Sequence, residues 1–432
     1  MNNYVERTNY LNKLNGFKEK NLIKVVTGIR RSGKSVLMEQ FQEQLKREGV
    51  KEEQIISLNF EKLENEDLLD YKKMHDYITE RLYKGGWTYL FLDEIQMVND
   101  FQKAINSLRT KEKVDIYVTG SNSSLLSGEL ATLLTGRCIT IHVLPLSFRE
   151  YLQAKKNQQF ERGETATTGT MPSAFKESWK NFYKKELDDY LRLGSFPQTL
   201  QLNTQKNIFD YLDDVYSAII RKDILARGKT IQEGILTSIA KFLFQNVGSE
   251  TSSVNITNTL KSNKREVSYN TVEKYIDYLK DSYIVYEANM FDVKGKQILK
   301  KNAKYYAVDS GLRSMLLASK ETDMGHVLEN IVFLELLRRE YKLSVGKIEV
   351  KKEDKTVIKE IDFVAEHKGG VEYFQVAASI LDPNILAREL EPLNNAKDHF
   401  PKYIITLDDY ITNTTHNGIR VIHAIDFLLG NY

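Results

Sequence analysis

The sequence predicts an α/β fold whose first part is built on a parallel sheet. Short apolar segments that look like buried strands, such as 22–27 and 88–92, alternate with segments of helical spacing. This alternation is typical of parallel sheets. A glycine-containing loop, Gly-Ile-Arg-Arg-Ser-Gly-Lys-Ser at 28–35, joins the first strand to an apolar helical pattern. We therefore expect a ligand at the carboxyl ends of the strands.

This loop has the pattern G-x-x-x-x-G-K-[ST] between a strand and a helix, which predicts a phosphate-binding loop. Gly28 and Gly33 let the backbone turn its N–H groups toward phosphate oxygens, and the helix adds its positive end. Lys34 can reach the β- and γ-phosphates, and the hydroxyl of Ser35 can hold Mg²⁺. The expected nucleotide contacts are Gly28, Ile29, Arg30, Arg31, Ser32, Gly33, Lys34, Ser35 and Val36. The two arginine side chains can equally point to solvent.

Further strands carry the other expected catalytic groups. A strand is expected at 55–60 and a helix at 67–83, before the apolar segment 88–92 ends in Asp93 and Glu94. In this Walker B pattern Asp93 joins the Mg²⁺ shell and Glu94 orients or deprotonates the attacking water. Two adjacent acids at a strand end can also form a helix N-cap.

Two more residues are candidates for contact with the γ-phosphate. Asn122 ends the expected strand 114–122, where its neutral amide can bond both water and phosphate, although a simple turn is the alternative. Arg137 precedes the expected strand 139–144. It can act as an arginine finger or as a sensor within the chain, because a guanidinium binds phosphate bidentately, or it can form a surface salt bridge.

These motifs resemble those of AAA-type ATPases of bacteria and archaea in which a C-terminal domain of unknown function follows the ATPase. The resemblance is carried by the loop at 28–35, Phe-Leu-Asp-Glu-Ile-Gln at 91–96, Thr-Gly-Ser-Asn-Ser-Ser-Leu-Leu-Ser at 119–127, Leu-Thr-Gly-Arg at 134–137 and Pro-Leu-Ser-Phe-Arg-Glu-Tyr at 145–151. It implies ATP and Mg²⁺ as cofactors. ATPases of this type often form rings in which arginine is supplied in trans, so a homo-oligomer is a candidate assembly, although the oligomeric state stays open. We expect residues 1–195 to form the ATPase domain, including a helical lid.

The middle region, 196–310, is predicted to be helical and to contain a winged helix. Residues 155–171 look like an exposed loop, and 182–193, 208–226 and 231–246 have helical spacing. Helices at 254–262 and 269–282, followed by strands at 283–291 and 304–308, give the winged-helix order. Basic residues that fit DNA phosphates are Lys264, Arg265, Lys274, Lys280, Lys294, Lys296, Lys300, Lys301 and Lys304. The alternative is a packing or protein-binding module, since three acids dilute the charge of the second helix.

The C-terminal region, 311–432, resembles the PD-(D/E)xK nuclease-like fold. The resemblance implies that Glu329 and Asp362 bind a divalent metal, with Gln375 offering its carbonyl. The lysine of that pattern is replaced by Ala377, which cannot stabilise charge or deliver a proton. We therefore expect a structural or binding remnant, unless Lys359 or another residue has taken the role of the lysine.

Composition sets the remaining expectations. Hydrophobic residues make up 41% and charged residues 28%, with a net charge of +2, so any nucleic-acid site must be local. One cysteine and the lack of a long apolar run favour a cytoplasmic protein without a membrane partner. The predicted function is ATP hydrolysis with Mg²⁺ that drives a conformational switch or motor, with DNA as a candidate partner. The alternatives are a nucleotide-gated regulator with little turnover and a metal-dependent nuclease.

Overall fold

The computed structural model describes residues 5–121, 136–161, 173–228, 230–318, 323–352, 355–409 and 414–432. The chain forms two compact units, and each is treated by itself. The first contains 1–145 with 281–283, and the second contains 146–280 with 284–432. None of the helices within the described ranges combines the length and the apolar character that a membrane crossing requires.

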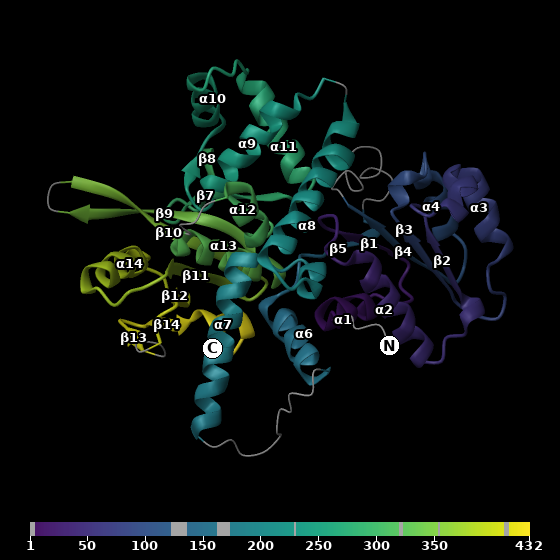
Figure 1. Cartoon of the computed structure of the whole chain (residues 1–432), viewed down its shortest axis with the longest axis horizontal. Coiled ribbons are helices and arrows are strands. Elements are labelled where there is room, and N and C mark those ends of the chain that lie inside the picture. The colour runs from purple at the N-terminus through teal and green to yellow at the C-terminus, as the bar shows by residue number, and fades with distance from the viewer. Residues whose placement is uncertain are drawn as a thin grey trace. The chain divides into compact units, whose positions relative to one another are not determined.

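The first unit is built on a parallel sheet, which confirms the predicted fold class (Figure 1). Among the described residues its five strands lie in the order β2-β3-β4-β1-β5. The strands are β1 (Ile23–Thr27), β2 (Ile55–Asn59), β3 (Thr88–Asp93), β4 (Val114–Gly120) and β5 (Cys138–His142). The strand that precedes the phosphate loop, β1, therefore lies between β4 and β5, and β4 separates it from the acidic strand β3.

Helices cover both faces of this sheet because its strands are apolar on both sides. Along β1, Val25 packs with α3 and α4, whereas Val26 packs with α1 and α2. The helices are α1 (Thr8–Gly16), α2 (Lys34–Arg47), α3 (Tyr71–Glu80) and α4 (Phe101–Arg109). Short turns are η1 (Glu52–Gln54), η2 (Leu63–Leu69) and η3 (Ile95–Met97).

A buried ion pair joins the two strands at the centre of this sheet. The ammonium of Lys24 on β1 contacts the carboxylate of Asp115 on β4, and both side chains are fully buried. Asp115 also accepts hydrogen bonds from the Tyr117 hydroxyl at 2.6 Å and from the Glu19 backbone at 2.8 Å. Burial lowers the pKa of Lys24, although Asp115 and Glu19 oppose this effect. Both buried charged groups therefore have hydrogen-bond or ion-pair partners.

The second unit contains a mixed sheet in the order β13-β14-β12-β11-β10-β9-β7-β8-β6, counted over the described residues (Figure 1). Strand β7 pairs antiparallel with β8 and parallel with β9. The strands are β6 (Glu250–Thr251), β7 (Val285–Asp292), β8 (Gln297–Ala307), β9 (Lys342–Lys352), β10 (Lys355–His367), β11 (Gly370–Ala377), β12 (Lys402–Thr406), β13 (Thr415–His416) and β14 (Ile419–His423).

Two helices cover opposite faces of this sheet. Leu393 of α14 belongs to an apolar cluster with Ile361 and Ile404, whereas Phe333 of α13 stacks on Tyr306 and lies near Phe363. The helices of the unit are α6 (Phe148–Glu161), α7 (Ser173–Leu193), α8 (Gln205–Ala218), α9 (Glu233–Gln245), α10 (Ser253–Ser262), α11 (Tyr269–Asp281), α12 (Ser310–Leu317), α13 (Met324–Arg338), α14 (Pro383–Asn395) and α15 (Ala424–Leu429). Short 3-10 helices are η5 (Pro197–Gln201) and η7 (Leu225–Arg227), and a π-helical segment, η6 (Ile219–Ile224), continues α8.

The chain divides differently from our expectation. The expected boundaries at residues 195 and 310 both lie inside the second unit, because α7 packs against α12 and β7 pairs with β9. The expected lid helices thus belong to the second unit rather than to the ATPase domain. Residues 155–161, expected as loop, form the last turns of α6, whereas 162–172 lie outside the described residues. The helices and the hairpin expected between 254 and 308 are present in the predicted order.

Candidate nucleotide-binding site

The phosphate loop leaves β1 at its carboxyl end and enters α2, as its sequence predicts. Gly28 has a φ of +141°, and a Cβ atom placed there would lie 2.2 Å from the carbonyl oxygen of Val143. Gly33 caps α2 with a φ of +95°. A side chain at position 28 is excluded by space, and left-handed backbone at position 33 favours glycine. The loop therefore requires both glycines for reasons independent of any ligand.

Lys34 and Arg7 hold the two sides of this loop. The ammonium of Lys34 donates to the carbonyl oxygens of Gly28 at 3.1 Å and Ile29 at 3.2 Å. The guanidinium of Arg7 is buried and donates to the carbonyl oxygens of Ser32 at 3.1 Å and Leu144 at 2.8 Å. Arg7 was not predicted from the sequence. No local pattern indicates that an arginine will donate to a backbone carbonyl 25 residues further along the chain.

The two acids of β3 are positioned by a threonine on the neighbouring strand. Thr119 is fully buried on β4. Its hydroxyl donates to the carboxylate of Asp93 and accepts a 2.9 Å hydrogen bond from the backbone N–H of Glu94. The other carboxylate oxygen of Asp93 accepts a 2.8 Å hydrogen bond from the Asn59 amide on β2. Three adjacent strands thus converge on Asp93 and Glu94 at the carboxyl edge of the sheet.

Glu94 lies in a buried environment that alters its acidity. It is 8% exposed and has left-handed backbone with a φ of 54°. Burial raises the pKa of its carboxyl group, while the Lys34 ammonium and a hydrogen bond from the Gln96 amide act in the opposite direction. A buried carboxylate close to a lysine has the character of a general base. Among the described side chains, the amide oxygen of Gln96 is buried without a hydrogen-bond partner.

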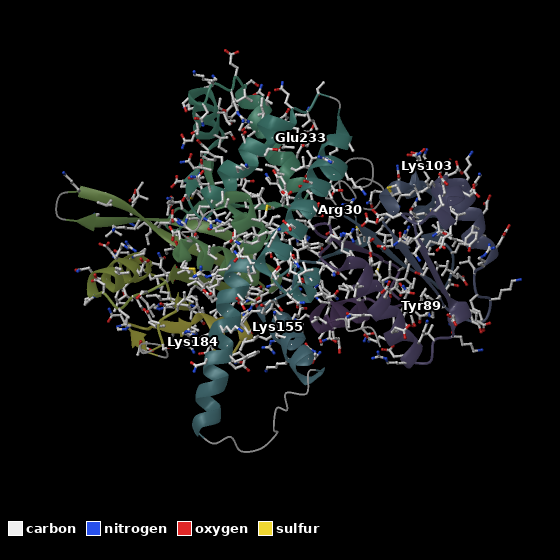
Figure 2. The ribbon with its side chains drawn as sticks, viewed as in Figure 1. Arg30, Tyr89, Lys103, Lys155, Lys184 and Glu233 are labelled. Carbon is white, nitrogen blue, oxygen red and sulfur yellow. The ribbon has the colours of Figure 1, made fainter. Side chains whose placement is uncertain are left out.

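The remaining predicted loop residues differ in their surroundings. Arg30, labelled in Figure 2, forms a 3.1 Å ion pair with Glu61, and Arg31 is exposed with a φ of 68°. Ser35 and Val36 are half-buried in the first turn of α2. Asn122 lies outside the described residues.

Arg137 lies at the opposite edge of the sheet from the phosphate loop. Its carbonyl oxygen accepts a hydrogen bond from Ile23 at the start of β1, and its guanidinium donates to Asn106 at 3.3 Å. At about 3.3 Å per residue, the length of β1 separates it from the loop by roughly 17 Å. The structure therefore does not bring Arg137 to Lys34 within one chain. Arg137 lies too far from the phosphate loop to act as a γ-phosphate sensor in cis.

The residues present fit a nucleoside triphosphate with a divalent cation. Ser35 and Asp93 provide a hydroxyl and a carboxylate, which are oxygen ligands of the kind that Mg²⁺ prefers. The loop around Lys34 offers backbone N–H groups at a helix N-terminus. The buried hydroxyl of Ser32 in this loop has no hydrogen-bond partner among the described atoms. Such an orphaned polar atom is expected where a ligand completes a site.

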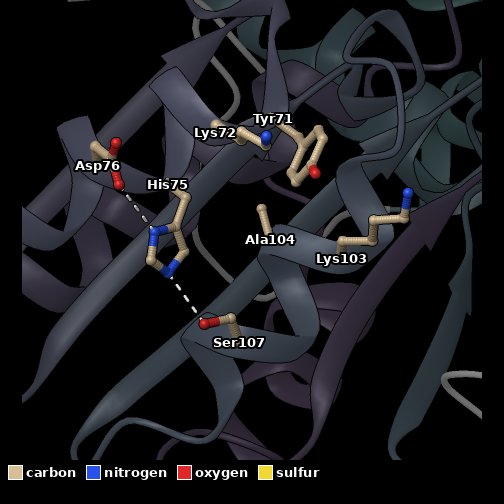
Figure 3. A pocket seen from close by; sticks show the side chains of 7 residues that line it. All are labelled: Tyr71, Lys72, His75, Asp76, Lys103, Ala104 and Ser107. Carbon is tan, nitrogen blue, oxygen red and sulfur yellow. Dashed lines mark hydrogen bonds and ion pairs between the residues drawn. The ribbon is translucent and has the colours of Figure 1, made fainter.

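A separate cavity of about 310 Å³ lies between α3 and α4 (Figure 3). His75 contacts the Ser107 hydroxyl at 3.0 Å and the Asp76 carboxylate at 3.3 Å. Although this order resembles a catalytic triad, Asp76 directly follows His75 on one helix and its side chain is 75% exposed. A solvated neighbour cannot hold the ring as a buried carboxylate does, so we assign no chemistry to this cavity.

The C-terminal region brings Glu329 and Asp362 together, but around a lysine. The Nζ atom of Lys304 lies 3.0 Å from Glu329 Oε1, 2.6 Å from Glu360 Oε1 and 3.7 Å from Asp362 Oδ1. Burial acts against the charge of Lys304, but the three carboxylates outweigh it and raise its pKa. Burial and the neighbouring carboxylates of Glu329 and Glu360 raise the pKa of Asp362, and Lys304 opposes this.

The other residues of the expected nuclease pattern do not join this group. Gln375 accepts a hydrogen bond from the backbone of Asp362 at 3.3 Å and donates to Glu389 at 2.8 Å. Ala377 packs in the apolar cluster beneath α14, and Lys359 pairs with Glu391 at 2.8 Å. Lys359 therefore does not take the missing role. Lys304 was expected on a DNA-binding hairpin, and that expectation is corrected because its side chain is buried.

Several other basic residues of the expected DNA surface are engaged within the second unit. Lys280 pairs with Glu287 at 2.6 Å and Asp277 at 3.3 Å, and Arg265 donates to the Ser238 hydroxyl. Lys294 donates to the carbonyl oxygen of Glu349 at 3.0 Å. The two acids offset the charge of Lys280, and the other two contacts occupy donors that would otherwise be available to phosphates.

The fold and the loop define an AAA-type P-loop protein of the kind that binds ATP. Residues 20–152 match the AAA domain family model, and residues 184–323 match a model described only as a domain of unknown function. The chain is 37% identical to an uncharacterized protein of Haemophilus influenzae over 98% of both chains. It is 30% identical to an uncharacterized protein of Methanocaldococcus jannaschii over 90% of this chain and 83% of that one. The chain belongs to the same family as these two proteins.

One solved structure aligns weakly with most of this chain. A Walker-type ATPase of Pyrococcus abyssi aligns with 72% of this chain and 96% of its own, with 14% identity and a TM-score of 0.47.

Proposed function

We propose that this protein hydrolyses ATP with Mg²⁺ to drive a conformational switch. One observation carries the proposal. Thr119 binds both Asp93 and the backbone of Glu94 at the strand edge from which the phosphate loop also leaves. A loop that binds phosphate needs no such pair of acids for binding alone, whereas hydrolysis needs a cation ligand and a base for water.

Each side chain has a role that its position supports. Lys34 would bind the β- and γ-phosphates, and Ser35 with Asp93 would hold Mg²⁺. The metal neutralises charge on the phosphates when it is bound. Glu94 would orient the attacking water and accept its proton, aided by burial that raises its pKa. Asn122 stays a candidate γ-phosphate sensor.

The proposed switch follows from the contacts that ATP would replace. The Lys34 ammonium donates to the carbonyl oxygens of Gly28 and Ile29. It must exchange these acceptors for phosphate oxygens when ATP binds. Gln96 holds the carboxylate of Glu94, and this contact must loosen before Glu94 can accept a proton from water. ATP binding is therefore expected to rearrange the loop and the end of β3 together.

The test is steady-state ATP hydrolysis by the purified full chain with Mg²⁺. Lys34→Ala should abolish turnover and weaken ATP binding, because the γ-phosphate loses its main positive partner. Glu94→Gln should bind ATP and hydrolyse it slowly. Lys46→Ala is the matched control, since Lys46 lies on the same helix and pairs with exposed Glu43 at 3.3 Å. Turnover that persists in Lys34→Ala or in Glu94→Gln would contradict the proposal.

A second candidate is a nucleotide-gated binding protein with little turnover. Two contacts favour this candidate. Lys34 donates to a backbone carbonyl oxygen of the loop, and Gln96 donates to the carboxylate of Glu94, so neither Lys34 nor Glu94 is positioned for hydrolysis in this arrangement. The two candidates separate in one experiment. Lys34-dependent ATP binding without turnover supports the gated protein, and Lys34-dependent turnover supports the ATP-driven switch. Turnover that also rises with double-stranded DNA would identify DNA as the partner of that switch.

A homo-oligomer would give Arg137 a role that it lacks within one chain. Its exposed position at the amino edge of the sheet suits an arginine that acts on a neighbouring subunit. In that case Arg137→Ala should lower turnover per subunit without weakening ATP binding, and turnover should rise with protein concentration. Concentration-independent turnover would count against supply in trans.

A further inference from the structure

The buried cluster around Lys304 is unusual because three carboxylates share one ammonium group. Lys304 and Glu329 are nearly inaccessible, with side chains 4% and 10% exposed, and Asp362 is 9% exposed. Glu360 is 29% exposed and also contacts Lys347 at 3.0 Å. Several anions gathered in a poorly hydrated place require a cation, since each would otherwise lose its hydration uncompensated.

The three buried groups come from different parts of the second unit. Lys304 lies on β8, Glu329 on α13 and Asp362 on β10. The Tyr306 hydroxyl on β8 also donates to Glu329 at 2.8 Å. One residue further along α13, the side chain of Asn330 exchanges two hydrogen bonds with the backbone of Ala307, at 2.7 and 3.0 Å. Strand β8 is thus joined to α13 through alternating charged and neutral contacts.

These residues do not fit a bound divalent metal. The ammonium of Lys304 lies within 4 Å of all three carboxylates, where a metal ion would have to bind. Gln375, expected as a ligand, is held by Asp362 and Glu389 instead. Within the described ranges, no group of three or more histidine, cysteine or acidic side chains is arranged to hold a metal. The burial of Lys304 and Asp362 also keeps a phosphodiester away from them.

We propose that the ammonium group of Lys304 takes the place of the divalent cation in this nuclease-like region. The cluster is then a metal-independent ionic core that attaches the β7–β8 hairpin to α13 and β10. The positive charge is supplied by a strand of the hairpin rather than from β11, where Ala377 occupies the position of the lysine in the nuclease pattern. This inference concerns the second unit and does not depend on the proposed ATPase activity.

The test compares melting temperatures of the nucleotide-free full chain with EDTA and with MnCl₂. All proteins carry Asp93→Asn, so that Mn²⁺ loses the carboxylate expected to bind it in the candidate nucleotide site. With Lys304 intact, the melting temperature should be the same in EDTA and in Mn²⁺. Lys304→Met should lower it by about 10 °C, because the buried carboxylates of Glu329 and Asp362 lose their cation while Glu360 keeps Lys347.

Mn²⁺ should then restore part of the loss in Lys304→Met, and adding Asp362→Asn should remove this response. The matched control is Lys359→Met on the same strand as Asp362, whose pair with Glu391 is half-exposed and whose loss should change little. If Lys304→Met does not fold, Lys304→Met/Glu329→Gln/Asp362→Asn should recover folded protein, because it removes the uncompensated charges as well.

Three results would overturn the proposal. The first is Mn²⁺ stabilisation of the protein with Lys304 intact that Asp362→Asn abolishes, which would identify a metal site. The second is Lys304→Met melting like its parent. The third is a destabilised Lys304→Met whose melting temperature does not rise with Mn²⁺. This would show that the ammonium group does not occupy a position in which a divalent cation can bind.

Discussion

Thr119 offers the sharpest test of how the candidate site is built. Substitution by valine keeps the shape of the side chain and removes the hydroxyl. The Glu94 N–H then loses its 2.9 Å acceptor, and Asp93 loses a donor. Both groups lie where Thr119 is fully buried, so water cannot readily replace the hydroxyl.

The magnitude follows from these two bonds. An unsatisfied buried N–H costs about 1–3 kcal/mol, and a hydrogen bond to a charged group contributes about 1.5–3 kcal/mol. If the bond to Asp93 is needed in the transition state, its loss lowers kcat by roughly 10- to 100-fold, because about 1.4 kcal/mol corresponds to a tenfold change. The free energy of unfolding should fall by about 1–3 kcal/mol.

The matched control is Thr88→Val at the amino end of β3. Its hydroxyl accepts a 2.9 Å hydrogen bond from the Tyr83 backbone and is equally buried, but it lies at the opposite edge of the sheet. Thr88→Val should lose similar stability in urea and keep its kcat. Steady-state hydrolysis and urea unfolding of both variants make the comparison. Thr119→Val with kcat within twofold of the parent would refute the assigned role of Thr119.

Three further predictions address other parts of the molecule. Asp115→Ala leaves Lys24 buried and unpaired, so urea unfolding of the first unit should lose about 3–5 kcal/mol, whereas Asp100→Ala at an exposed pair should lose under about 1 kcal/mol. Burial raises the pKa of Asp309 from 3.8 to about 6, so the folded state holds this proton more tightly. Stability from this group is full below pH 4 and is lost as pH rises through 6, by about 3 kcal/mol, and Asp309→Asn should flatten that window in urea titrations. Gln96→Ala removes a hydrogen bond that lowers the pKa of Glu94, so the acid limb of the kcat–pH profile should move to higher pH, and an unmoved limb would contradict this.

The sequence predicts the first unit well because its signals are local. The loop at 28–35 and the acids at 93–94 each lie within one strand and its turn, so spacing alone locates them. Their meeting at one sheet edge follows from the parallel order of the strands. Thr119 escaped prediction, because a threonine near the end of a strand is common and its contacts are made across the sheet.

The second unit was harder to predict because its organisation depends on pairing between distant segments. Strand β9 joins β7 in parallel at Asn289 and Ser344, and no local pattern indicates such a partner. The lysine that contacts Glu329 and Asp362 was likewise missed, because the sequence pattern directs attention to positions 359 and 377 on β10 and β11. A long side chain can reach a site from any neighbouring strand, and Lys304 does so from β8, far from the acids in sequence.

The pairing of the hairpin also affects which partner the region can bind. Strand β7 is hydrogen-bonded on both edges, and Lys294 near the turn is held by Glu349. The exposed residues of α11 include two acids, Glu273 and Asp277, and one lysine, Lys274. A face with a net negative charge repels a phosphate backbone, and the missing positive charge would have to come from elsewhere. The charge of α11 therefore does not by itself attract DNA, and the DNA-stimulated turnover assay tests whether the region binds it.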